Sequence, residues 1–429
     1  MRMHPIALAV ALGALCGTAG AQTLTGWARM PAATFSDGPT SGQFAAPNAY
    51  GTNLPPFVAK QPVQGFSGVL PGPRPNTFRF LVDNGFGAKA NSADALLRAY
   101  TLAIDWKTAR GGSGTVAPAD WKTGRTRGAF DARTRLQLND ANRQLTVPIQ
   151  ADYTHYYDDA SKPEVDPAIR SGRLLTGADF DIESVRVDRN GHYWFGDEFG
   201  PYLIKTDAKG TVLRAQIPLP GVRAPENAEV VSGTATANLA ASGGFEGMAL
   251  NASGTKLFTL LEKTVVGDAA KTLRINEFDL ATEAYTGAQW VYPLEADGTA
   301  IGDMTAVDDH RFIVIERNGA TATGGGTPFK RLYLIDLEGV ASGGTVAKTL
   351  LVDLMAIADP DDLNADGSTT FTLPYVTIED VLVLDRRTLL VANDNNFPYG
   401  GGRELASDDT EFLRIRLPAP LTGRGAGRD

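Results

Sequence analysis

A two-strand pattern marked by acidic residues occurs four times between residues 183 and 394, and it constrains the fold more than any other feature. Each copy begins with an acidic residue and an apolar strand, turns at residues such as Asn190-Gly191, and ends its second strand at another acidic residue. The two marks of a copy lie 13 to 16 residues apart, which fits two strands of about six residues joined by a tight turn. A weaker copy lies between Phe66 and Gly85. The marked positions are Glu183 with Glu198, Glu246 with Glu262, Asp303 with Glu316, and Glu379 with Asp394.

The spacing of the copies predicts a repeat architecture. They follow one another after 57 to 76 residues. Propeller blades of several strands repeat after about 40–50 residues, and the longer period here leaves room for inserted loops. We therefore expect an all-β protein that forms a single β-propeller of six or seven blades, with residues 107–175 as an irregular one. A β-sandwich with acidic turns is the alternative.

The two ends of the chain are expected to lie outside the propeller domain, which we place at residues 61–417. Residues 22–60 are rich in Gly, Pro, Ala and Ser, which favours an irregular N-terminal segment. Residues 418–429 contain prolines and Gly-Arg pairs and are expected to form a disordered tail. Within the domain, the best helical periodicity lies at residues 92–103.

The first 21 residues have the three parts of a secretory signal: a basic start at Arg2, an apolar run from Ile6 to Leu15, and the small residues Ala19-Gly20-Ala21. The run is shorter than the roughly 20 residues that span a bilayer. We expect a signal peptide at residues 1–21, a periplasmic or secreted protein, and no membrane insertion after processing; an uncleaved anchor is the alternative. Since Cys16 is the only cysteine, the processed chain would contain no disulfide.

Charge and missing motifs exclude several function classes. The net charge of −9 disfavours nucleic acids and anionic membranes as partners. The sequence has no Gly-x-Ser-x-Gly elbow, and His155, His192 and His310 lie in no metal-binding pattern, so we expect neither a zinc site nor a Ser-His-Asp triad. We expect a monomer that acts on a small anionic or ester substrate.

The repeated acidic residues are the candidate metal site. In a propeller the inner hairpins converge on the axis, so these carboxylates would repel one another and take up protons unless a cation intervenes. Calcium suits such a ring because it takes six to eight oxygen ligands. Solvated turn residues are the alternative. The expected ligands of Ca²⁺ are Glu183, Glu198, Glu246, Glu262, Glu316, Glu379 and Asp394.

Basic residues follow two of these acids and begin a later strand. Those that reach the channel mouth would bind a phosphate or carboxylate group; ion pairing with the adjacent acids is the alternative. A further loop, Asp362-x-Asn364-x-Asp366-Gly367, begins like an EF-hand but has Leu373 where the bidentate Glu belongs, so it is either a calcium loop of another kind or a plain acidic turn. The candidate substrate-binding residues are Lys263, Arg317, Lys330 and Arg331, and the candidate catalytic residues are Glu198, Glu316 and Arg317.

The chain resembles the phytase-like family, exported proteins described as having esterase-like activity of phytase. The motifs that carry this resemblance keep a consistent order over residues 66–417, and among them are Asp181-Ile-Glu-Ser-Val185, Gly244-Phe-Glu-Gly247, Ile378-Glu-Asp-Val381 and Asn393-Asp-Asn-Asn-Phe-Pro398. The resemblance implies a β-propeller and a calcium-dependent hydrolase of phosphate or other esters that acts at the channel mouth. A lactonase or sugar-acid hydrolase on the same axial metal, and a non-catalytic propeller that binds a ligand or a protein, are the alternatives.

Overall fold

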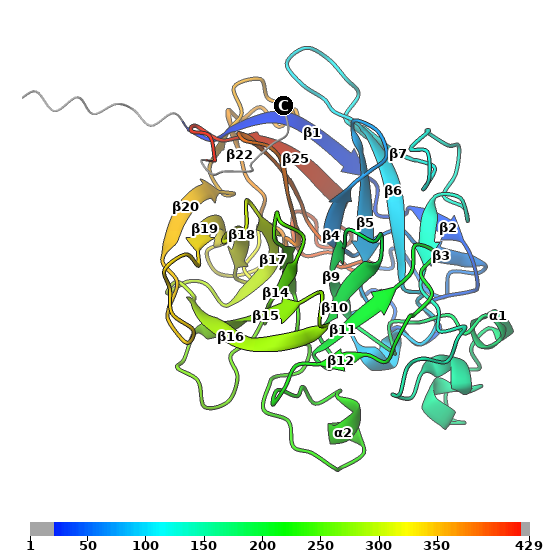
Figure 1. Ribbon diagram of the computed structural model, residues 1–429. Coiled ribbons are helices and arrows are strands. Elements are labelled where there is room, and N and C mark those ends of the chain that lie inside the picture. The colour runs from blue at the N-terminus through cyan, green and yellow to red at the C-terminus, as the bar shows by residue number, and fades with distance from the viewer. Residues whose placement is uncertain (1–20, 422–429) are drawn as a thin grey trace, which may run out of the picture.

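The computed structural model describes residues 21–421, in which β-strands form nearly all of the regular structure (Figure 1). Three four-stranded antiparallel sheets follow one another along the chain, each a meander of consecutive strands. The first consists of β9 (Ile182–Val187), β10 (Tyr193–Asp197), β11 (Tyr202–Thr206) and β12 (Ile217–Pro218). The second consists of β13 (Gly247–Leu250), β14 (Lys256–Leu260), β15 (Thr272–Asp279) and β16 (Ala284–Pro293). The third consists of β17 (Ala300–Ala306), β18 (Arg311–Arg317), β19 (Lys330–Asp336) and β20 (Lys348–Asp353).

The two ends of the domain meet in one composite sheet with the order β23-β24-β25-β1-β7-β6-β5-β4. Strand β1 lies antiparallel to β25 and thereby joins the first strand of the chain to the last one. One half of this sheet contains β23 (Asp380–Asp385), β24 (Thr388–Ala392), β25 (Thr410–Arg416) and β1 (Thr23–Met30). The other half contains β4 (Phe66–Pro71), β5 (Thr77–Val82), β6 (Arg98–Asp105) and β7 (Thr115–Pro118), with β8 (Arg135–Gln137) paired to β6.

Five strands, one from each group, form a closed ring at the centre. Strand β4 contacts β9, β9 contacts β13, β13 contacts β17, β17 contacts β23, and β23 returns to β4. The groups extend outward from this ring, as Figure 1 shows for the sheets that follow β9, β13 and β17. Such a ring of sheets differs from the two stacked layers of the alternative β-sandwich.

The core is divided among the interfaces between neighbouring groups. In β18, for example, Phe312 and Val314 pack toward the second sheet, while Ile313 and Ile315 pack toward β23 and β24. Both faces of the strand are therefore buried, which explains its run of consecutive apolar residues where a one-sided sheet would alternate. This arrangement holds the inner ends of the hairpins at fixed positions.

The five inner hairpins are those that the acid-marked pattern predicts, including the weaker copy at β4 and β5. The predicted six or seven blades are not confirmed, because the described residues contain five such groups. Residues 107–175 add only β7, β8 and short helices such as α1 (Pro167–Ser171). Long insertions, rather than further blades, account for the extra length.

Two local predictions are wrong. The helix expected at residues 92–103 is absent, and β6 begins at Arg98, because pairing with β5 and β7 outweighs the apolar spacing. Residues 22–60 are not wholly irregular, since β1 completes the composite sheet and β2 (Phe35–Asp37) pairs with β3 (Lys60–Pro62). The predicted signal peptide falls almost entirely on residues 1–20, outside the described part of the chain, as do residues 422–429 of the expected tail.

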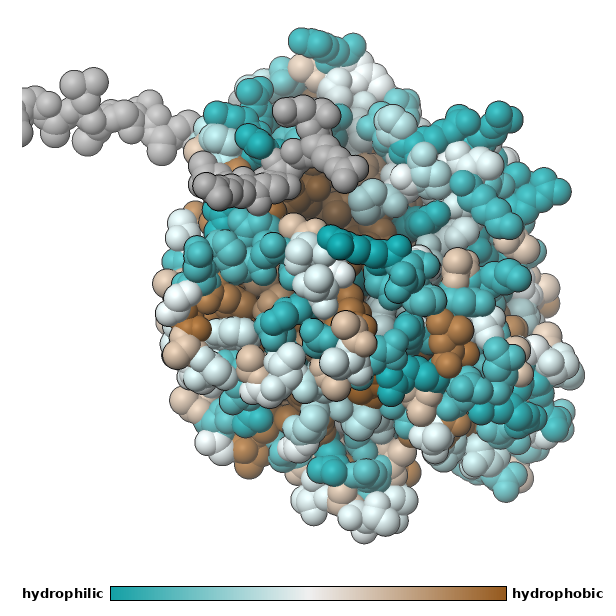
Figure 2. Space-filling model, viewed as in Figure 1, coloured by the Kyte–Doolittle hydropathy of each residue, from teal (hydrophilic) through white to brown (hydrophobic). Residues whose placement is uncertain are grey.

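Within residues 21–421 no helix has the length and apolarity needed to cross a bilayer. Figure 2 shows hydrophilic side chains over much of one face, with apolar residues in small groups between them. Such small groups are ordinary on protein surfaces and do not by themselves mark a partner.

Candidate active site

The inner ends of the five hairpins gather buried carboxylates around one arginine. The first strands bring Glu183, Glu246 and Glu379, and the second strands end at residues of the same kind or at Arg317. All are buried or nearly so, although carboxylates are rarely buried without a partner. We call this group the axial cluster: Asp83, Asp181, Glu183, Glu198, Glu246, Glu262, Arg317, Glu379 and Asp394.

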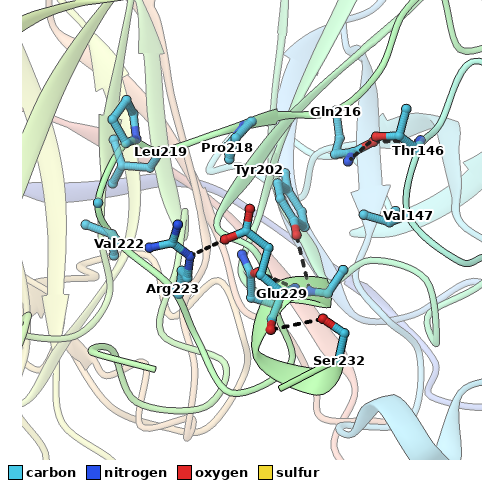
Figure 3. A pocket seen from close by; sticks show the side chains of 14 residues that line it. Thr146, Val147, Tyr202, Gln216, Pro218, Leu219, Val222, Arg223, Glu229 and Ser232 are labelled. Carbon is cyan, nitrogen blue, oxygen red and sulfur yellow. Dashed lines mark hydrogen bonds and ion pairs between the residues drawn. The ribbon is translucent and has the colours of Figure 1, made fainter. Parts of the chain in front are cut away.

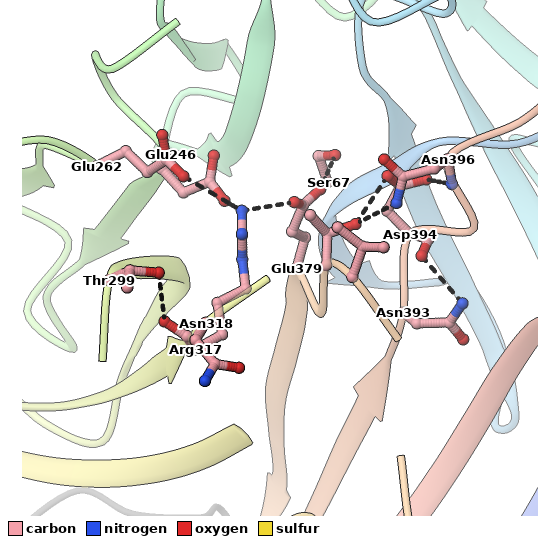
Figure 4. Close-up of polar contacts among 12 residues, drawn as sticks. Ser67, Glu246, Glu262, Thr299, Arg317, Asn318, Glu379, Asn393, Asp394 and Asn396 are labelled. Carbon is pink, nitrogen blue, oxygen red and sulfur yellow. Dashed lines mark hydrogen bonds and ion pairs between the residues drawn. The ribbon is translucent and has the colours of Figure 1, made fainter. Parts of the chain in front are cut away.

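Arg317, the last residue of β18, bridges three glutamates from other hairpins (Figure 4). Its Nη2 lies 3.1 Å from Oε1 of Glu246, 3.3 Å from Oε1 of Glu262 and 3.1 Å from Oε1 of Glu379. Burial opposes the charged guanidinium, but the three carboxylates outweigh burial and raise the pKa of Arg317. The guanidinium of Arg317 is therefore the positive charge beside three carboxylates of the predicted ring.

Glu379 is the carboxylate with the most varied surroundings. Its Oε1 faces Arg317, and its Oε2 accepts a hydrogen bond of 2.8 Å from the hydroxyl of Ser67 in β4. Burial and the negative charge of Asp394 raise its pKa to about 8 despite the arginine. Glu379 therefore titrates near pH 8 and keeps its proton at neutral pH.

The remaining acids of the cluster have no cation of comparable strength beside them. Burial first, and then Asp394 and Asp181, raise the pKa of Asp83. Burial and the charge of Asp181 raise the pKa of Glu183. Burial and the charges of Glu262 and Glu246 raise the pKa of Glu198. Two oxygens, Oδ1 of Asp181 and Oε1 of Glu198, are buried without a hydrogen-bond partner. This part of the cluster has more acceptors than the protein supplies with donors.

Two other acids join the inner strands to one another. Asp303 in β17 contacts Arg186 of β9 at 3.2 Å and accepts a hydrogen bond of 3.2 Å from the backbone N–H of Val381 in β23. Asp380 in β23 accepts a hydrogen bond of 3.0 Å from the backbone N–H of Gly68 in β4. Asp303 and Asp380 thus hold the ring together, which explains their burial without a role in chemistry.

Glu316 lies apart from the cluster, although it precedes Arg317. Its carboxylate accepts hydrogen bonds from Tyr292 Oη at 2.8 Å and from the N–H of Glu295 at 2.6 Å, and it pairs with Lys348 Nζ at 2.7 Å. Successive residues of a strand point to opposite faces, so only one of Glu316 and Arg317 can face the axis. The sequence-based placement of Glu316 among the metal ligands and catalytic residues does not fit these contacts.

The same alternation separates the two basic residues of β19. Lys330 is opposite Arg317 in the ladder and is buried, with its Nζ donating to the carbonyls of Asn318 and Val376. Burial and the nearby Arg317 lower the pKa of Lys330 to about 7. Arg331, by contrast, pairs with Asp353 at 3.2 Å near the surface and does not reach the cluster.

Lys263 remains at the edge of the cluster. Its Nζ pairs with Oε2 of Glu262 at 2.7 Å, and its side chain is 36% exposed. Of the predicted basic residues, Arg317 and Lys330 therefore lie inside and Lys263 lies at the rim.

Sequence reasoning missed three groups at the centre: Ser67, Asp83 and Asp181. Ser67 and Asp83 belong to the weaker fifth copy of the pattern, whose first strand has a serine where the other copies have an acid. Asp181 lies two residues before Glu183 in the copy that does carry the marks. Treating the weak copy as a full member of the ring would have found the first two.

The donor chemistry of the axial cluster fits calcium. Its groups are carboxylates, which calcium prefers, and the unpartnered oxygens and raised pKa values show that the carboxylates outnumber the cationic side chains beside them. Their spacing is not that of a tight metal cage. Within residues 21–421, His310, Asp336 and Glu338 at the surface are the one group of three whose ligand atoms lie within 4.8 Å of one another.

The EF-hand-like loop is held by hydrogen bonds among its own residues. The N–H of Gly367 donates to Asp362 Oδ1 at 3.1 Å, and the Asn364 amide donates to Asp366 Oδ2 at 2.8 Å. Leu373, at the position of the missing Glu, is fully buried in the core.

Comparison with known proteins gives one family and several distant structures. The chain is 13% identical to the periplasmic gluconolactonase PpgL of Pseudomonas aeruginosa, covering 91% of this chain and 99% of that one with a TM-score of 0.38. An exo-β-1,3-galactanase of Phanerochaete chrysosporium is 13% identical, with 90% of this chain and 64% of that one covered and a TM-score of 0.37. A luciferin-regenerating enzyme is 10% identical, with 93% of this chain and 94% of that one covered and a TM-score of 0.34. No curated protein sequence matches the chain.

The family model of the Phytase-like proteins, described as "Esterase-like activity of phytase", matches residues 61–397. This match begins just before β4 and ends just after Asn396, so it includes every residue of the axial cluster. The chain belongs to the Phytase-like family.

Proposed function

We propose that this protein is a hydrolase of phosphate or other esters and that its chemistry takes place at the axial cluster of a β-propeller. Family membership supports a hydrolase. The observation that carries the proposal is the contact between Arg317 and Glu379, which joins a fixed positive charge to a carboxyl group that titrates near pH 8. General acid–base catalysis is most effective when the catalytic pKa lies near the working pH.

In this proposal Glu379 and Glu198 move the proton and Arg317 holds the substrate. The pKa of each carboxyl group is raised, so one of the two in its ionised form would take a proton from the attacking water while the other in its protonated form would donate one to the leaving group. Nε of Arg317 is buried without a hydrogen-bond partner and would donate to a substrate oxygen. Lys330 and Lys263 would add positive charge beside an anionic substrate.

Calcium is the cofactor that we propose for this site. It would be held by Glu183, Glu246, Glu262 and Asp394, joined by Asp83 and Asp181, and when bound it would polarise the scissile ester group. Glu198 and Glu379, which the sequence also placed among the ligands, are left out because a carboxylate bound to calcium holds no proton to transfer. Glu316 is not included because Lys348 and Tyr292 already occupy its carboxylate. We further propose that the protein acts as a monomer in the periplasm or outside the cell, as the N-terminal sequence suggests.

The test is a substrate panel on the purified protein. Chromogenic phosphate esters, carboxylic esters and lactones are incubated with the protein in calcium or in a chelator. We expect turnover of a phosphate or carboxylic ester, and a loss of at least a hundredfold in kcat/KM in Glu379→Gln and in Arg317→Lys. Glu164→Gln is the matched control, because this side chain is 72% exposed and outside the cluster.

Each other result of the panel has a definite meaning. Turnover of lactones alone would replace the ester hydrolase with a lactonase. No turnover in either condition would favour a propeller that binds a ligand or a protein without catalysis.

A further inference from the structure

A cavity of about 520 Å³ lies beside the axial cluster, and five aromatic rings contribute to its wall. It is formed between residues 147–157 and the segment around α2 (Ala228–Val231). Its rings are those of Tyr153, Tyr156, Tyr157, Phe199 and Tyr202. A cavity of this size, largely apolar and with a few polar groups, is the usual form of a site for a small molecule.

The tyrosines form a concave corner rather than a flat platform. The ring centres of Tyr153 and Tyr157 are 5.6 Å apart with planes at 54°, and those of Tyr156 and Tyr157 are 5.1 Å apart at 87°. Tyr157 is held in place because its hydroxyl donates to the carbonyl of Ala178 at 2.7 Å and to Asp179 Oδ1 at 2.9 Å. The corner is therefore preformed and can enclose a ring of similar size.

The polar groups of the cavity select against a charged ligand. The ammonium group of Lys89 lies 5.0 Å from the ring centre of Tyr157 and 5.2 Å from that of Phe199, so the cation–π position is already filled. Asp179 and Glu226 would repel an anion. A neutral ligand neither competes with Lys89 for the ring faces nor is repelled by the two carboxylates.

One polar atom in the wall lacks a partner. Oε2 of Glu226 is buried and accepts no hydrogen bond, whereas the oxygens of Asp179 accept from Gln150, Thr176 and Tyr157. An unpartnered buried carboxylate oxygen costs free energy that a hydroxyl donor on a ligand would recover. Glu226 thus adds a requirement for a hydroxyl group to the requirement for a ring.

The cavity is next to the axial cluster in the chain and in space. Phe199 directly follows Glu198, and Asp179 lies two residues before Asp181. Lys89 interacts electrostatically with Asp179, Asp197 and Asp181.

A neighbouring cavity of about 360 Å³ shares Tyr202 and Val147 with this one but lacks these features (Figure 3). Its polar side chains satisfy one another: Gln216 donates to Thr146 Oγ1 at 2.9 Å, and Arg223 pairs with Glu229 at 2.5 Å. It has no comparable group of rings around it. The aromatic cavity is the better candidate.

We propose that the aromatic cavity is a binding site for a neutral six-membered ring that bears a hydroxyl group, and that it holds this part of the substrate beside the axial cluster. The position relative to the cluster rests on the proposed function, but binding of the ring does not. The ring could belong to a sugar or to an aryl alcohol, since both present apolar faces and a hydroxyl donor.

The experiment measures binding by titration calorimetry or ligand-observed NMR on the full chain. Benzyl alcohol, benzoate and benzylammonium share one ring and differ in charge, and methyl β-D-glucopyranoside tests the sugar. We expect the neutral compounds to bind at least tenfold more tightly than both ions. Tighter binding of benzyl alcohol or of the glucoside identifies the aryl or the sugar source.

Variants locate the binding. Tyr153→Ala and Glu226→Ala are expected to weaken binding of the neutral probe at least tenfold while the melting temperature changes little. Tyr50→Ala removes a tyrosine that is 58% exposed and outside the cavity, and it should bind as the wild type does. Absence of binding by both neutral probes, equal binding of the ions, or unchanged binding in both cavity variants would overturn the proposal. Binding of the neutral probes without any ester turnover would contradict the proposed function and leave the binding site supported.

Discussion

Nη2 of Arg317 lies 3.1 Å from Oε1 of Glu379, and this contact joins the third sheet to the strand that begins at Asp380. The same nitrogen also reaches Glu246 and Glu262, so one buried cation connects three hairpins. Removing one partner of a buried ion pair costs far more than the pair contributes, because a charge is left without compensation. The centre of the fold therefore depends on this arginine.

Arg317→Met is expected to lower the free energy of unfolding by about 3–5 kcal/mol, because three buried glutamates lose their shared partner. Urea unfolding at neutral pH measures the change. The control is Arg331→Met, which breaks a pair whose side chains are 35% and 29% exposed and should cost no more than about 1 kcal/mol. Equal losses in the two variants would mean that Arg317 does not connect the three hairpins as described.

Asp303→Asn is expected to destabilise the ring by about 3 kcal/mol without touching the proposed chemistry. Asp303 pairs with Arg186 of β9 and accepts a hydrogen bond from the N–H of Val381 in β23. The neutral amide of the asparagine cannot compensate the charge of the buried guanidinium. Urea unfolding again gives the change, with Asp353→Asn at the surface as control. If Asp303→Asn unfolds at the same urea concentration as the wild type, the acid does not join these strands as described.

The hairpins could be predicted from sequence because they depend on local chemistry. Alternating or continuous apolar runs and a turn such as Asn190-Gly191 define each pair of strands, and all five pairs exist. The number of groups could not be obtained by dividing the length by the period, because insertions such as residues 107–175 lengthen the chain without adding an inner strand. The composite sheet also escaped prediction, since β1 and β25 are paired across nearly the whole sequence.

Side-chain direction decides which of the predicted site residues lie in the axial cluster. Glu316 and Arg317 are adjacent in sequence, and only the ladder shows that Arg317 and Lys330 face the axis while Glu316 is held by Lys348. An acid-marked pattern specifies where strands end, within about a residue, but a shift of one residue reverses the face. The ring of acids was therefore predictable, and the exact membership was not.

Raising the pH is expected to destabilise the protein. In the folded state Glu379 keeps its proton up to about pH 8, whereas in the unfolded chain it ionises near 4.5. Between these values the folded state binds more protons than the unfolded state, so stability falls as pH rises. The melting temperature should therefore decrease between about pH 5 and pH 8, and other cluster acids with raised pKa values act in the same direction.

The variant Glu379→Gln tests this assignment, because it removes one titrating group from the cluster and should make the pH profile flatter. Glu164→Gln, at an exposed position, should keep the wild-type profile. A melting temperature that rises with pH over this range would contradict the raised pKa values.

Calcium is expected to reverse the loss of stability at high pH, because it would replace protons as the partner of the excess carboxylates. A ligand that binds only the folded state stabilises it by RT ln(1 + [L]/Kd), about 2.7 kcal/mol at a hundredfold excess over Kd. The melting temperature at pH 8 should rise on addition of calcium and fall with a chelator, and the effect should shrink at pH 5, where protons compete for the same oxygens. Glu183→Gln and Glu246→Gln should each weaken calcium binding in calorimetry, and Glu164→Gln should not. Identical melting curves with calcium and with chelator at pH 8 would mean that protons and Arg317 alone balance the cluster.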